Sequence, residues 1–122
     1  HTMSLLASRF DTLNYLAKSM AEGHNFEIDA RAFADLVLQL RDDLYDYTSS
    51  PAILDRVDQI PDLDLAPHQR SFLEQLLPSG ARGMVGDYQV KQKILAQVND
   101  ITRAFNRIRD MLPIGPSEED FV

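Results

Sequence analysis

The apolar residues of this chain recur with the period of an α-helix, most clearly over residues 87–112. Their spacing of three or four residues places them all on one side of a helix. Asp87 stands at the position of an N-cap, no glycine or proline interrupts the stretch, and Pro113 ends it. The pattern therefore predicts one long helix, whose core-facing side chains are Val90, Ile94, Val98, Ile101, Phe105, Ile108 and Leu112.

Two further long amphipathic helices are predicted in the first half of the chain. The first runs from a Ser4 cap to about Glu22, and Gly23 follows it at the usual position of a left-handed C-cap. The second is predicted to begin at an Asp29 cap and to end near Tyr47. Their predicted core faces are Leu5, Leu6, Phe10, Leu13, Leu16, Ala17 and Met20, and then Phe33, Leu36, Val37, Leu40, Leu44 and Tyr47.

Prolines divide the middle of the chain into two short predicted helices. Ser50 caps the first, Pro51 takes its first helical position, and Pro61 ends it. Pro67 opens the second and Pro78 ends it, because proline cannot continue a helix. The apolar edges of these two helices are Ile53 or Leu54, Val57 and Ile60, and then Phe72, Leu73, Leu76 and Leu77.

The predicted elements define an all-α fold, since no stretch alternates apolar and polar residues over the length of a strand. We expect a four-helix-bundle-like domain with three long helices and a broken third leg made of the two short helices. Residues 1–2 precede the first methionine and are interpreted as a vector-derived scar. Residues 3–113 form the single predicted domain, and residues 114–122 form a flexible acidic tail.

The composition narrows the classes of partner. The 122 residues carry a net charge of −7, which argues against nucleic acid or an anionic membrane as the main partner. The acidic first half is expected to pack against a slightly basic last helix. The chain has no cysteine, so disulfides and thiolate metal sites are excluded. A soluble, cytoplasmic protein is the expectation, because no apolar run is long enough to span a membrane.

The glycine-rich segment before the last helix is a candidate phosphate-binding site. Gly80, Gly83 and Gly86, with Arg82, lie close to the start of a helix, where backbone N–H groups can bind anions. The spacing matches neither known phosphate-binding fingerprint, and Asp87 places a negative charge where a phosphate would lie. A hinge or linker is the preferred interpretation, with the anion site as the open alternative.

Metal binding and catalysis find little support in the residue pattern. Asp62, Asp64 and His68 could hold a divalent cation, but the ligands and the glycine of an EF-hand loop are missing. His24 and His68 have no serine or aspartate at a spacing that indicates a catalytic relay. We therefore expect no metal, no cofactor and no enzymatic activity.

Two acidic residues lie at an electrostatically unfavourable end of the second predicted helix. Asp43 and Asp46 lie at the C-terminal end of the second helix, where negative charge opposes the helix dipole. A basic partner protein, or Arg70 or Arg82 of this chain, would compensate them.

The basic residues of the last helix have a simpler interpretation. Arg103 lies three residues after Asp100, and Arg107 lies three residues before Asp110. These spacings predict ordinary intrahelical ion pairs. A nucleic-acid interface would need a larger basic patch with aromatic residues beside it.

An outer flank of the second long helix carries the functional hypothesis. Leu38 and Tyr45 lie away from the core face with acidic neighbours, which indicates a docking surface for another protein and favours a basic surface on that partner. The sequence thus predicts an adaptor or regulatory module that binds protein. The alternatives are an acidic inhibitor or nucleic-acid mimic, a homodimer-forming domain and, least favoured, a small enzyme or ligand-binding bundle. The candidate contact residues are Ala34, Leu38, Arg41, Asp42, Tyr45 and Asp46.

Overall fold

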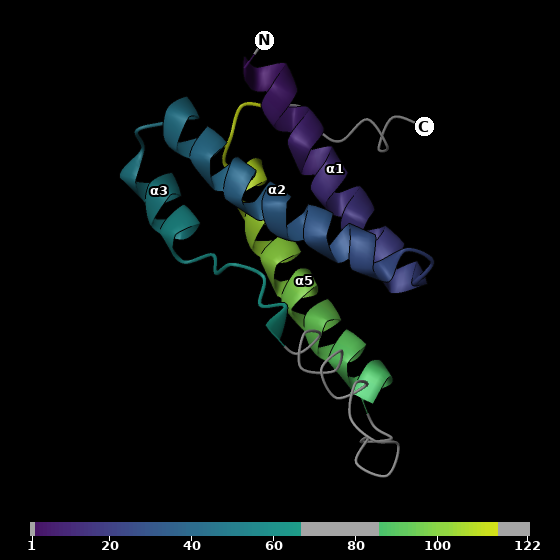
Figure 1. The fold of residues 1–122 in the computed structure, drawn as a ribbon. Helices are drawn as coiled ribbons and strands as arrows, with labels where there is room; N and C mark the ends of the chain where they lie inside the picture. The colour runs from purple at the N-terminus through teal and green to yellow at the C-terminus, as the bar shows by residue number, and fades with distance from the viewer. Residues whose placement is uncertain (1, 67–85, 115–122) are drawn as a thin grey trace.

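The computed structural model describes residues 2–66 and 86–114, which form α-helices and no strand (Figure 1). The all-α prediction is confirmed for this part of the chain. None of its helices combines the length and the hydropathy that a bilayer span requires. The helices are α1 (Thr2–Glu22), α2 (Phe26–Tyr47), α3 (Pro51–Asp58) and α5 (Gly86–Asp110).

The helices pack side by side with alternating directions, as in a bundle. α1 and α2 form an antiparallel hairpin, and α5 runs antiparallel to α1 (Figure 1). α3 contacts both α2 and α5, and the chain after it extends along α5 as far as Ala66. The described part of the third leg is therefore α3 followed by an extended link. The second short helix predicted after Pro67 lies outside the described residues.

The core lies where α1, α2 and α5 meet, and three phenylalanines fill its centre. Phe10, Phe33 and Phe105 are completely buried. The rings of Phe10 and Phe105 meet edge to face, with centroids 6.3 Å apart and an interplanar angle of 74°. The predicted core face of α5 is buried throughout, except that Val90 is half-buried at its start. On α1, Leu16 is buried as predicted, whereas Leu5 is half-exposed and its assignment to the core was wrong.

The predicted start of α2 is wrong. The helix begins at Phe26, with Asn25 in the N-cap position, and Asp29 lies inside its first turn. Phe26 is buried in the core, so hydrophobic contact extends the helix one turn upstream. Asp29 is buried as well and accepts a hydrogen bond from the Ser19 hydroxyl at 2.6 Å. The carboxylate thus joins α2 to α1 and does not cap its own helix.

The predicted ends of α1 and α2 and the predicted start of α3 are confirmed at Glu22, Tyr47 and Pro51. The remaining helix ends differ from prediction by a few residues. α1 begins at Thr2 and not at a Ser4 cap, and α5 begins at Gly86, so Asp87 lies in its first turn. α5 ends at Asp110, after which the next two N–H groups make tighter bonds to carbonyls three residues back. Gly23 has a φ of +85° at the end of α1, which confirms the predicted left-handed C-cap.

Candidate functional site

The outer side of α2 presents two large apolar side chains to solvent. Leu38 is 46% exposed and Tyr45 is 48% exposed. They lie seven residues apart, which is two helical turns, so they share one side of the helix. Asp42 and Asp46 are exposed beside them. We call these four residues the α2 surface.

The two remaining predicted contact residues are held within the protein. Arg41 donates a hydrogen bond from Nη1 to the Ile60 carbonyl at 2.9 Å and forms an ion pair with Asp62. Its guanidinium therefore fastens α2 to the link that follows α3. Ala34 is half-buried and packs against the core. Both residues lie in the same helical row as Leu38 and Tyr45 and therefore border the α2 surface.

The acidic residues at the end of α2 have different environments. Asp43 forms an ion pair with Arg9 of α1, which is a compensating charge that was not predicted, whereas Arg70 and Arg82 lie outside the described residues. Asp46 and Asp42 are exposed. The unfavourable position of Asp43 relative to the helix dipole is thus offset by a neighbouring helix, which sequence spacing could not reveal.

A polar seam joins α1 to α5. The side-chain amides of Asn14 and Asn106 exchange hydrogen bonds of 3.1 and 2.9 Å. Arg109 donates to Asp11 at 3.0 Å while its guanidinium lies 5.6 Å from the centre of the Phe10 ring. Arg109 is buried, and this pair is where the acidic first half meets the slightly basic last helix, as expected.

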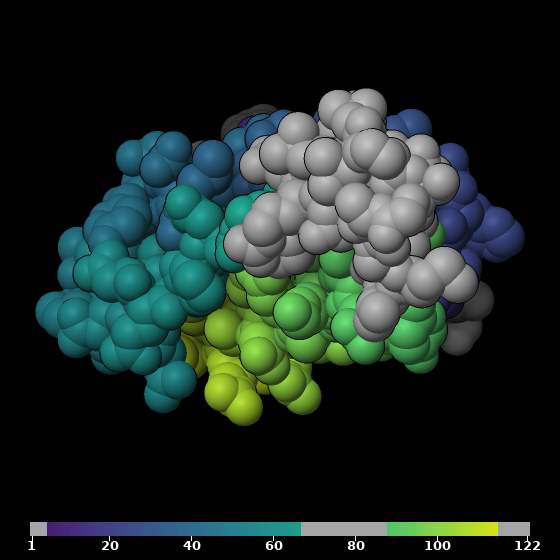
Figure 2. Space-filling view, turned by 60° about the horizontal axis from the view of Figure 1, so that its bottom comes forward, coloured from purple at the N-terminus to yellow at the C-terminus, as the bar shows by residue number. Residues whose placement is uncertain are grey.

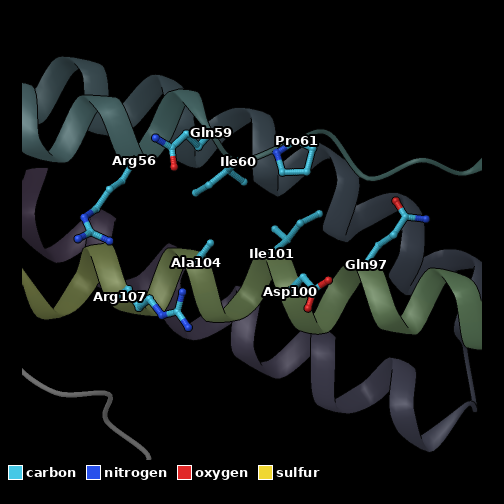
Figure 3. A pocket seen from close by; sticks show the side chains of 9 residues that line it. All are labelled: Arg56, Gln59, Ile60, Pro61, Gln97, Asp100, Ile101, Ala104 and Arg107. Atoms are coloured by element: carbon cyan, nitrogen blue, oxygen red, sulfur yellow. The ribbon is translucent and has the colours of Figure 1, made fainter.

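A groove opens between α3 and α5, with a cavity volume of about 310 Å³. The two helices meet along one face of the molecule in the space-filling view (Figure 2). Ile60 lies across the gap from Ile101 and Ala104, and these side chains form an apolar floor (Figure 3). Arg56 and Arg107 lie at one end. The rest of the lining is Gln59, Pro61, Gln97 and Asp100.

Sequence reasoning missed this groove. The predicted ion pair between Arg103 and Asp100 is present, but Arg107 makes no ion pair with Asp110 and lines the groove. The only local signal is the small Ala104 in a row of larger apolar side chains. A small side chain leaves a cavity only where the neighbouring element does not pack against it, and here that contact depends on the position of α3.

The other candidate chemistry is not assembled in the described residues. They contain no cluster of three or more potential metal ligands, and Asp62 is engaged by Arg41. His24 is exposed. His68 and most of the glycine-rich segment lie outside the described residues, so the choice between hinge and anion site remains a prediction.

Comparisons with known proteins add no relative. No family model matches this chain, and neither do any curated protein or solved structure. The fold places this chain among all-α proteins with bundle-like helix packing. Its surfaces are therefore the features that indicate a function.

Proposed function

We propose that this protein is an interaction module that binds another protein through the α2 surface. The observation that carries the proposal is the pair Leu38 and Tyr45, each almost half-exposed on a helix whose opposite side fills the core. Tyrosine is one of the residue types enriched at the hot spots that supply most of the binding energy in protein interfaces, and the exposed leucine enlarges the apolar area beside it.

The charge around the pair favours a partner with a basic surface. Asp35, Asp42 and Asp46 are exposed on α2, and Asp55 and Asp58 are exposed on α3. The protein as a whole carries a net charge of −7. Lysine or arginine residues around an apolar patch on the partner would complement this rim and accelerate the encounter.

The surface is preorganised for binding. Arg41 lies between Leu38 and Tyr45 along the helix. Its guanidinium is bound to the Ile60 carbonyl and the Asp62 carboxylate of the link after α3. Leu40 and Leu44 hold the other side of the same turns in the core. A partner would therefore bind without first ordering this helix, which removes one of the usual entropic costs of association.

Self-association through the same surface is the less favoured alternative. A two-fold interface centred on Leu38 and Tyr45 would bring the acidic rims of both copies together. Carboxylates of like sign at close range repel each other, and little of that repulsion is screened inside an interface. A partner with the opposite charge does not meet this cost.

The test is quantitative affinity capture with Leu38→Lys/Tyr45→Lys, which removes both anchors and neutralises the local negative charge. The matched control is Leu5→Lys/Tyr15→Lys, because these α1 residues are 50% and 58% exposed. We expect both variants to keep the circular dichroism of the original protein. Proteins that the original and the control capture equally should be lost with the α2 variant. Equal capture by all three proteins would refute the α2 surface as the binding site.

A further inference from the structure

The groove between α3 and α5 has the features of a small-ligand site that is independent of the α2 surface. We propose that it binds a small organic anion, namely a carboxylate with a short apolar body. The carboxylate lies between Arg56 and Arg107, and the apolar body lies on Ile60, Ile101 and Ala104.

The floor of the groove provides the apolar part of the site. Ile60 is 3% exposed and Ile101 is 1% exposed, so only the edges of these side chains reach the groove, and the half-buried Ala104 and the exposed Pro61 supply the rest of its apolar lining. Ala104 contributes only a methyl group, which leaves room above α5. The volume of about 310 Å³ falls at the lower end of the range of small-molecule pockets, which fits a short ligand.

Two cations line one end of the groove. Arg56 comes from α3 and Arg107 from α5, so each wall contributes one guanidinium group at this end (Figure 3). Neither forms an ion pair within the described residues, whereas Arg41 and Arg109 each form an ion pair with an aspartate of another segment. Guanidinium groups bind carboxylates through charge-assisted hydrogen bonds.

The opposite end of the groove is lined by polar side chains that already have partners. The side-chain amide of Gln97 accepts a hydrogen bond from the Asp64 N–H at 2.8 Å and donates one to the Asp64 carbonyl at 3.1 Å. These bonds hold the link against α5. Asp100 also lines the groove, but its carboxylate is paired with Arg103. The site therefore has one cationic end and one polar end, with an apolar lining between them.

The overall charge favours a singly charged head group. With a net charge of −7, the protein repels anions at long range, and a dianionic phosphate meets about twice the penalty of a carboxylate. A free inorganic anion would also leave the apolar floor uncovered. A monocarboxylate with an apolar body satisfies both parts of the groove.

The experiment is a titration of the ¹⁵N-labelled full chain with hexanoate, followed by amide chemical shifts, with 1-hexanol as the neutral match. We expect saturable shifts confined to residues 56–61 and 97–107, and affinity for hexanol at least about tenfold weaker, since a lost charged contact is of that size. Shifts scattered over the surface, equal affinity for the two probes, or no saturable shift with hexanoate would overturn the proposal.

Variants test separately how the charge and the shape of the groove contribute to hexanoate binding. Arg56→Gln/Arg107→Gln should weaken hexanoate binding more than about tenfold, because it removes two charge-assisted bonds. Arg31→Gln, an exposed arginine of α2 that does not line the groove, should stay within about twofold. Ala104→Leu should weaken binding by occupying part of the cavity without a change of charge. If that variant does not fold, the arginine pair still decides, since equal losses in the double variant and in Arg31→Gln contradict the site.

Discussion

α5 contacts the rest of the protein on two sides, and the two contacts differ in kind. Towards α1 it is closely packed, with the ring of Phe105 against Phe10 and the Asn14–Asn106 amide pair beside it. Towards α3 it leaves a cavity of about 310 Å³, and the hydrogen bonds that span this contact come from Gln97 to the link.

The difference follows from what each neighbour can bury. α1 has 21 residues and presents a full apolar side to α5, whereas α3 has 8 residues and buries only Ile53 and Val57. A short helix cannot cover the whole of a long one. Among the described residues, α3 and its link leave a groove beside α5, so one amphipathic helix serves as scaffold on one side and as the wall of a candidate site on the other.

The largest expected effect lies on the closely packed side. Phe105→Asp should unfold the domain, because it places an unpaired charge among fully buried side chains, at a cost of about 4 kcal/mol or more. Circular dichroism and thermal unfolding measure this directly. Phe105→Leu is the control and should remain folded. A folded, soluble Phe105→Asp protein would show that this side of α5 is not the core.

A smaller loss is expected at the polar seam between α1 and α5. Arg109→Ala leaves the Asp11 carboxylate without its partner and exposes the face of Phe10, which should lower the free energy of unfolding by about 2 kcal/mol. Arg103→Ala is the matched control, since both members of its ion pair are mostly exposed and such pairs contribute about 0.5 kcal/mol or less. Urea unfolding of both variants compares them. Equal losses would mean that burial does not distinguish the two arginines.

The same substitution, alanine to leucine, tests the core and the groove separately. Ala30→Leu adds three carbons at a site that is 4% exposed, and overpacking should cost about 1–3 kcal/mol. Ala104→Leu adds the same atoms into the groove, where they meet open space and should change stability by less than about 1 kcal/mol. Thermal unfolding of the two variants tests this. A larger loss for Ala104→Leu would show that the α3 side is packed as closely as the core.

The candidate sites differ in how far the sequence revealed them. Leu38 and Tyr45 were predicted to lie off the core face, and both are indeed exposed, because helical period alone determines which side of a helix a residue occupies. Arg41 is one of the predicted contact residues, yet the sequence did not indicate its bonds to the Ile60 carbonyl and the Asp62 carboxylate. Whether these residues contact a partner remains a prediction.

The sequence by itself determined the helices, the all-α class and the core faces, since these depend on contacts within a few residues of the chain. Only the tertiary structure decided which charges meet. Arg9 and Asp43 are 34 residues apart, and Arg109 and Asp11 are 98 apart, so their pairing depends on how the helices align. The start of α2 and the groove beside Ala104 were decided in the same way. A buried Phe26 extended one helix, and the short reach of α3 left another partly uncovered.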